Sequence, residues 1–118
     1  MLSLRSKETE KKYQEVRTGR DPSFCALCEA TPLEEFTHWK ILQNDFPYDE
    51  VASTHDMLVS KRHVTEGEIT QEEWLEYNKI KHGYVAEKYE IVMEGTQKLK
   101  SIPDHFHVHL LVLHPVDF

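Results

Sequence analysis

The sequence predicts an α+β fold, and three of its features indicate this class. Several short apolar stretches have the length of strands, one longer segment has the spacing of an amphipathic helix, and a final stretch alternates histidine with apolar residues. The chain of 118 residues is long enough for one domain with its own core. We expect an N-terminal extension over residues 1–22 and a folded domain over residues 23–118.

The first twenty residues are polar and rich in charge, which favours a helical or frayed segment loosely tied to the rest. Residues 39–42 form a short apolar run that predicts a strand. Residues 44–49 are rich in turn formers and predict a loop. Residues 55–60 predict a second strand, which the basic pair Lys61-Arg62 ends.

Thr70 is expected to open the main helix, because Glu73 follows at the spacing of a capping box. Aromatic and aliphatic residues then recur at steps of three and four, and we interpret this stripe as core packing rather than cofactor contact. Residues 89–93 predict another strand, and residues 105–113 predict the last one.

Charge and composition exclude some classes of function. The chain has 14 basic and 21 acidic residues, a formal net charge of −7, which argues against general binding of nucleic acid or anionic membranes. No long apolar run or signal peptide is evident, so we expect no membrane association and a cytoplasmic protein. In a reducing compartment, Cys25 and Cys28 are expected to bind metal or act in redox chemistry rather than form a structural disulfide.

The last predicted strand places three histidines in strict alternation. His105, His107 and His109 would share one face of a strand, and the intervening apolar residues would share the other. Imidazole titrates near neutral pH, so such a row can divide the roles of nucleophile, acid and orienting group. The alternative is an edge strand whose solvated face carries histidine.

This strand resembles the histidine triad (HIT) pattern, His-φ-His-φ-His-φ-φ, in which φ is apolar. Three further segments are similar to that family and occur in its order over roughly residues 24–113. They are the strand from His55 to His63, the Asn-x-x-Pro-Tyr loop at Asn44, Pro47 and Tyr48, and the Cys-x-x-Cys of its zinc-bearing members at Cys25 and Cys28.

The resemblance implies a HIT-like fold, with an antiparallel sheet of about five strands, one main helix and often a homodimer. It also implies action on the α-phosphate of a purine nucleotide conjugate, such as a phosphoramidate, a dinucleoside polyphosphate or an adenylate. A covalent nucleotidyl-histidine would form and then be resolved, which splits one displacement into two. The alternative is a non-catalytic nucleotide-binding or partner-binding module on a zinc-stabilised HIT fold.

The resemblance further implies individual roles. His107 would be the nucleophile, His109 would contact the phosphate and help to protonate the leaving group, and His55 would complete the catalytic imidazole cluster. Asn44 would face the ribose, although a turn-forming role explains it equally well. Ser101 would grip phosphate in a segment, residues 97–104, that departs from the family's Gly-Gln-Ser or Gly-Gln-Thr. Because His109 stands where sugar-nucleotide transferases carry Gln, the chain resembles the hydrolase branch.

The metal expectation also comes from the resemblance. Four residues correspond to the ligands of zinc-bearing relatives, namely Cys25, Cys28, His63 and His105. Two thiolates and two imidazoles suit a structural zinc ion. A free reduced pair and a redox-active Cys-x-x-Cys are the alternatives.

Overall fold

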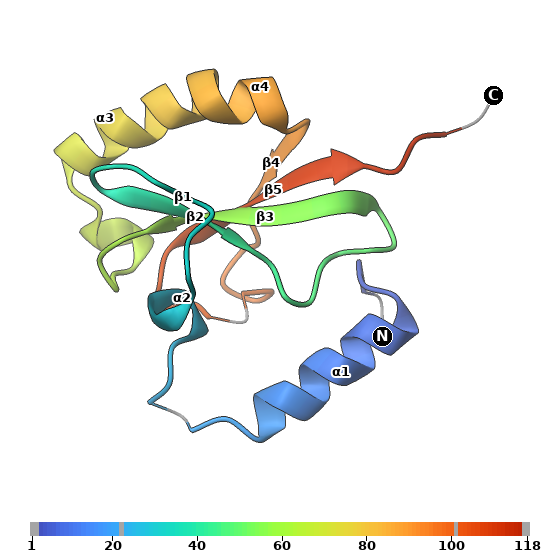
Figure 1. The fold of residues 1–118 in the computed structure, drawn as a ribbon. Helices are drawn as coiled ribbons and strands as arrows, with labels where there is room; N and C mark the ends of the chain where they lie inside the picture. The colour runs from blue at the N-terminus through green and yellow to red at the C-terminus, as the bar shows by residue number, and fades with distance from the viewer. Residues whose placement is uncertain (1–2, 22, 101, 117–118) are drawn as a thin grey trace.

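The computed structural model describes residues 3–21, 23–100 and 102–116, and it confirms the α+β class (Figure 1). One antiparallel sheet has the strand order β1-β2-β3-β5-β4. Its strands are β1 (Glu34–Glu35), β2 (Trp39–Gln43), β3 (Ala52–Ser60), β4 (Ile91–Met93) and β5 (His107–Leu113). The helices are α1 (Lys7–Thr18), α2 (Ala26–Glu29), α3 (Gln71–Ile80) and α4 (Ala86–Lys88), with a 3₁₀ turn η1 (Glu66–Glu68) and a π turn η2 (Lys81–Val85).

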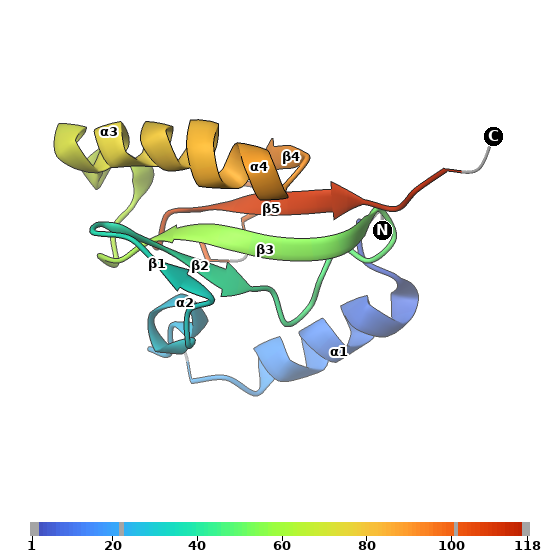
Figure 2. The same ribbon diagram turned by 45° about the horizontal axis from the view of Figure 1, so that its top comes forward.

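Both faces of the sheet are covered. Figure 2 shows α3 and α4 on one face, and α1 and α2 on the other. The α3 face carries a core that includes Trp39, Ile41 and Leu58. The α2 face carries a smaller cluster of Leu27, Leu42, Met57 and Val59. Because both faces are covered, β3 is buried without interruption from His55 to Ser60, and its apolar residues Met57, Leu58 and Val59 are consecutive rather than alternating.

Strand β5 has the alternation that the sequence predicts. His107 lies opposite Val59 and His109 lies opposite Met57, so both histidines are on the α2 face. Phe106 and Val108 belong to the core on the α3 face. The regular strand begins at His107, two residues later than predicted, because His105 lies in the connection that leads into it.

The main helix is confirmed together with its start. The Thr70 side chain accepts a hydrogen bond from the Glu73 amide, and the Glu73 side chain accepts one from the Thr70 amide, which is the expected capping box. The predicted packing stripe lies on the core, where Tyr77 is 5.2 Å from Trp39 between ring centroids. The helix continues through η2 into α4.

The other boundaries differ modestly from expectation. Strand β3 begins three residues earlier than predicted and β4 two residues later. Strand β1 was not predicted, because its two exposed glutamates carry no strand signal. In the part of the chain that the structure describes, no helix combines the length and apolar character needed to cross a membrane.

Helix α1 is confirmed as helical, but the expectation of loose attachment is wrong for its first turn. The amide and hydroxyl of Ser6 both donate to the Asp49 carboxylate, at 2.7 and 3.0 Å. The Arg5 Nε–H donates to the carbonyl of Phe46 at 2.6 Å. These bonds fix the start of α1 to the loop between β2 and β3.

Candidate active site and metal centre

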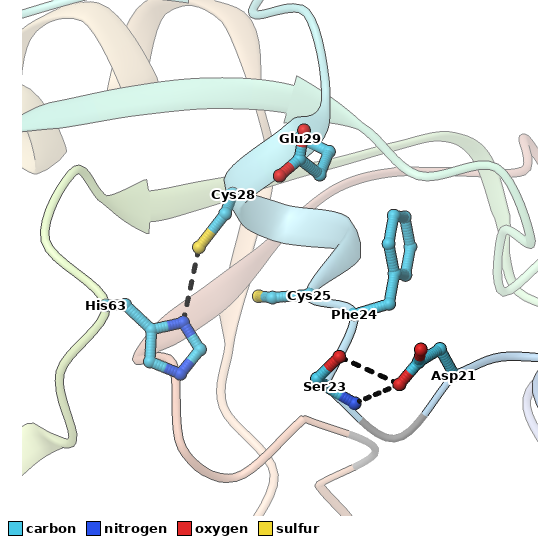
Figure 3. Close-up of a pocket in the computed structure, with 7 residues that line it drawn as sticks. All are labelled: Asp21, Ser23, Phe24, Cys25, Cys28, Glu29 and His63. Atoms are coloured by element: carbon cyan, nitrogen blue, oxygen red, sulfur yellow. Dashed lines mark hydrogen bonds between the residues drawn. The ribbon is translucent and has the colours of Figure 1, made fainter.

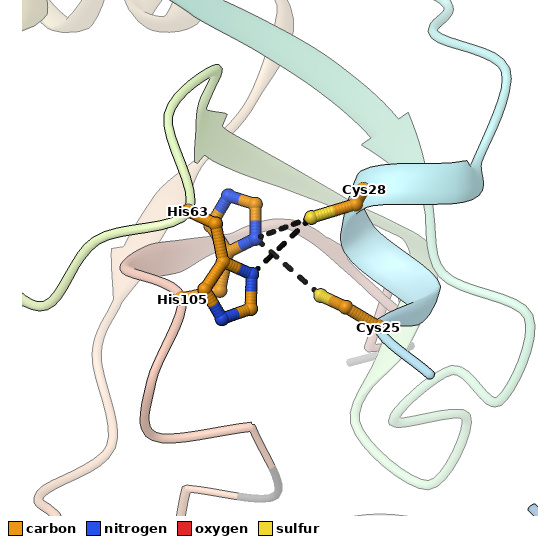
Figure 4. A group of neighbouring side chains, drawn as sticks. All are labelled: Cys25, Cys28, His63 and His105. Atoms are coloured by element: carbon orange, nitrogen blue, oxygen red, sulfur yellow. Dashed lines mark hydrogen bonds between the residues drawn. The ribbon is translucent and has the colours of Figure 1, made fainter. Parts of the chain in front are cut away.

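The four residues expected to bind metal lie together, although they come from three distant segments (Figure 4). Cys25 caps the N-terminus of α2 and Cys28 lies within it, His63 follows β3, and His105 precedes β5. One ligand atom from each residue lies within 4.8 Å of the others. This cluster could hold a metal ion.

Its geometry suits a tetrahedral ion. The Nδ1 atom of His105 is 3.5 Å from both sulfur atoms, and Nδ1 of His63 is 3.2 Å from Sγ of Cys28. Metal–sulfur and metal–nitrogen bonds of about 2.3 and 2.0 Å in a tetrahedron give S···N separations of about 3.5 Å. The distances therefore fit a single ion between the four groups.

A second hydrogen bond orients His105. Its Nε2–H donates to the carbonyl of Ser60 at 2.6 Å, which leaves the Nδ1 lone pair directed at the cysteines. Metal-binding histidines commonly use this arrangement, in which the non-ligating nitrogen donates to a carbonyl. His105 is fully buried, so this orientation is well fixed.

The other side of the cluster is open. A hollow of about 570 Å³ is lined by Phe24, Cys25, Cys28 and His63, together with Asp21, Ser23 and Glu29 (Figure 3). Cys28 and His63 are exposed there. A metal ion could therefore reach or leave the cluster without disturbing the sheet.

The predicted nucleophile, His107, is buried and oriented by the backbone. Its Nδ1–H donates to the carbonyl of His105 at 2.8 Å. A carbonyl can only accept, so the neutral ring has its proton on Nδ1 and a lone pair on Nε2. Burial is the main cause that lowers the pKa of His107, and the charge of Lys100 acts in the same direction. The ring is therefore neutral at pH 7.

The two other predicted catalytic residues form a hydrogen-bonded pair. The Tyr48 amide donates to Nδ1 of His55 at 2.9 Å, so the His55 proton lies on Nε2. That Nε2–H donates to Nδ1 of His109 at 2.8 Å. The His109 proton consequently lies on Nε2, where the Tyr48 hydroxyl is 3.4 Å away. His107 and His109 thus have opposite tautomers, one with a lone pair on Nε2 and the other with a proton there.

Burial keeps this pair uncharged. It is the largest cause that lowers the pKa of His55, to about 4, and the positive charge of Arg5 adds to it. Burial also dominates the lowered pKa of His109, about 3, followed by the neighbouring imidazoles and Arg5. The ring centroids of His107 and His109 are 5.4 Å apart, so the three imidazoles make one cluster.

The remaining predicted residues have different outcomes. The Asn44 Oδ1 atom accepts a hydrogen bond from the Phe46 amide at 2.8 Å, which is a turn-forming role. Its Nδ2 atom also lies 3.4 Å from Nε2 of His55, so its amide borders the imidazole cluster. Ser101, predicted to grip phosphate, lies outside the described residues.

Three residues near the cluster were not singled out as site residues from the sequence. Tyr48 was noted only as part of a loop pattern, yet its ring centroid is 4.4 Å from that of His55. Arg5 lies over the Tyr48 ring. Lys100 is nearly buried, with its Nζ atom 3.0 Å from the Glu94 carboxylate. The only sequence signal for Arg5 is its place among the charge-rich first twenty residues.

No protein-family model matches the chain, and no curated protein matches it.

Proposed function

We propose that this protein is a HIT-type nucleotide hydrolase or nucleotidyl transferase that acts on the α-phosphate of a nucleotide conjugate. The single observation that carries the proposal is the tautomer of His107. Its hydrogen bond to the carbonyl of His105 leaves the Nε2 lone pair free, and its lowered pKa keeps that lone pair available at pH 7. A neutral, oriented imidazole is a competent nucleophile.

The proposed reaction has two steps. In the first, Nε2 of His107 forms a bond to the α-phosphorus, and the bond to the leaving group breaks with its electron pair. The leaving group departs as an anion or takes a proton from solvent. In the second, water or another acceptor attacks the phosphorus, the P–Nε2 bond breaks, and its electron pair returns to His107. The acceptor's proton is released to solvent.

His109 would hold the phosphate. Its low pKa means that it is neutral and has no extra proton to give, so we assign it the role of hydrogen-bond donor through Nε2–H. The contact of that atom with the Tyr48 hydroxyl is long at 3.4 Å, which leaves the donor available to a phosphoryl oxygen. Oriented donors at developing charge are an effective form of catalysis.

We further propose that the metal is zinc. Two thiolates and two imidazoles that together supply all four ligands of a tetrahedral ion are typical of structural zinc sites. His105 then has two tasks, since its ring would bind the metal and its carbonyl orients His107. The ion would stabilise the connection into β5 rather than take part in the reaction.

A non-catalytic nucleotide-binding module is the second candidate. The near-complete burial of the three imidazoles favours it, since His55, His107 and His109 are only 4, 6 and 9% exposed. On this alternative the cluster would hold a nucleotide without transferring it.

The test is release of nucleoside monophosphate from an adenosine phosphoramidate, diadenosine tri- and tetraphosphate and an acyl-adenylate. We expect turnover of at least one compound by the wild type and none by His107→Ala. His82→Ala, which removes an exposed imidazole from η2, is the matched control and should keep full activity. Binding of AMP without turnover of any compound would replace the enzyme proposal with the binding module.

A further inference from the structure

The imidazole pair continues into a stack of side chains that reaches the N-terminal helix. The Tyr48 ring lies against both imidazoles, with centroid distances of 4.4 Å to His55 and 5.0 Å to His109. On Tyr48 lies the Arg5 guanidinium, 4.9 Å from the ring centroid. The same guanidinium lies 4.3 Å from the centroid of Tyr13 in α1. Arg5 is thus placed between two aromatic rings.

Directed hydrogen bonds hold Arg5 in this position. Its Nε–H donates to the carbonyl of Phe46 at 2.6 Å, and Nη1 lies 3.4 Å from the Glu10 carboxylate. The side chain is only 12% exposed. A planar guanidinium can stack and donate in its own plane at the same time, which a lysine ammonium cannot do.

Tyr48 sets the tautomers of both histidines beneath it. Its amide donates to Nδ1 of His55, which fixes the His55 proton on Nε2 and so directs the His109 proton to Nε2. Its hydroxyl lies on the far side of His109. A shift of the loop that carries Tyr48 would therefore release the tautomers of both His55 and His109.

We propose that Arg5 is a positioning residue, which holds Tyr48 against the His55–His109 pair and makes the start of α1 part of the site. A role of Arg5 in turnover rests on the proposed function, whereas its role in fixing the tautomers of His55 and His109 does not. The first turn of α1 supports this role, because Ser6 and Thr9 both donate to Asp49 in the same loop. Residues 5–9, at and just before the start of α1, thus hold the loop at Phe46 and at Asp49, on either side of Tyr48.

The experiment compares Arg5→Met, which keeps an unbranched apolar stem but removes the charge and the donors, with Lys11→Met. Lys11 is an exposed residue of α1, the helix that begins two residues after Arg5, so its variant makes the same change of charge nearby. Long-range ¹H–¹⁵N correlation spectra of the histidine side chains report the tautomers without any substrate. Turnover is measured on the best compound of the panel.

In Arg5→Met we expect the nitrogen shifts of His55 and His109 to move toward the average of two tautomers. We also expect kcat to fall at least about tenfold with little change in KM, since a misplacement of about 1 Å can cost about 10²-fold in rate. Lys11→Met should match the wild type in both measurements. Arg5→Lys keeps the charge but not the planar donor, so its histidine shifts and its kcat should lie between those of Arg5→Met and the wild type. If Arg5→Met does not fold, Arg5→Lys takes its place in the comparison.

Unchanged histidine spectra in folded Arg5→Met would overturn the proposal, and so would altered spectra with unchanged kcat. If the wild type has no turnover on any compound, the enzyme proposal fails. The spectra alone then decide whether Arg5 fixes the tautomers.

Discussion

The carbonyl of His105 accepts a hydrogen bond from Nδ1 of His107 at 2.8 Å, while the His105 ring faces the two cysteine sulfurs at 3.5 Å. One residue therefore belongs to both clusters. The candidate metal site and the predicted nucleophile are adjacent through its backbone, so we expect occupancy of the metal site to affect the orientation of His107.

Metal depletion should therefore affect His107. After treatment with a chelator, we expect its ¹⁵N shifts to move from a single Nδ1–H tautomer toward an average, because the connection before β5 loses its support. The measurement is the same correlation spectrum, with metal content determined in parallel. Shifts that stay at their original values in metal-free, folded protein would show that the carbonyl is held without the ion.

Loss of one metal ligand should lower both metal content and stability. His63→Ala should bind metal at least about tenfold more weakly and lose about 2 kcal/mol or more of unfolding free energy. Elemental analysis and thermal unfolding measure these effects. His82→Ala removes another exposed histidine and should keep close to one metal ion per chain, and equal metal content in the two variants would contradict the assignment of His63 as a ligand.

The buried Glu73 carboxylate should stabilise the fold in a pH-dependent way. Its hydrogen bonds from Arg62, at 2.7 and 3.0 Å, lower its pKa from 4.5 to about 2. A depressed pKa in the folded state means that the contribution is complete above about pH 4.5 and is lost as the pH falls through 2. Glu73→Gln should therefore be less stable than the wild type by about 2 kcal/mol at pH 7, the order expected for hydrogen bonds to a charged group.

Urea unfolding at pH 7 and near pH 2 measures this difference, which should shrink at the lower pH. Glu72→Gln is the control, because Glu72 also lies in the first turn of α3 but its side chain is 83% exposed. If both variants lose the same stability, helix-end charge rather than the Arg62 pair is responsible.

Asp49 should control the first turn of α1. Burial alone would raise its pKa, but the hydrogen bonds from Ser6 and Thr9 outweigh that effect and lower it, which keeps the acceptor ionised. In Asp49→Ala we expect the amides of this turn to exchange about tenfold faster, as a loss of roughly 1.4 kcal/mol in local stability implies. Hydrogen exchange measures this, and Asp45→Ala, an exposed change in the same loop, should leave the rates unchanged.

The sequence predicted those features that depend on residues close together in the chain. The capping box of α3 depends on residues three apart, and the alternation of β5 follows from strand geometry, so both were found in the sequence. The metal ligands came together as expected, but that expectation came from a family pattern rather than from spacing, since 77 residues separate Cys28 and His105.

Contacts between distant polar groups could not be predicted in this way. Arg5 and Phe46 are 41 residues apart, and the acceptor is a backbone carbonyl, which any residue offers. The tautomers of His55 and His109 likewise depend on contacts across 54 residues. A charged N-terminal segment has many solvated conformations of similar energy, so its composition alone favours none of them.

The sheet order has a consequence for how the protein is made. Of the strands that the structure describes, β5 is the last in the chain, yet it lies between β3 and β4. At about 5–20 residues per second, a ribosome adds His105 about 4 to 15 s after Cys28. During that interval the chain carries both thiols without His105, and once β3 is complete its edge has no β5 to pair with. Before β5 is added, the nascent chain is therefore most open to oxidation of its thiols and to mispairing at the edge of β3.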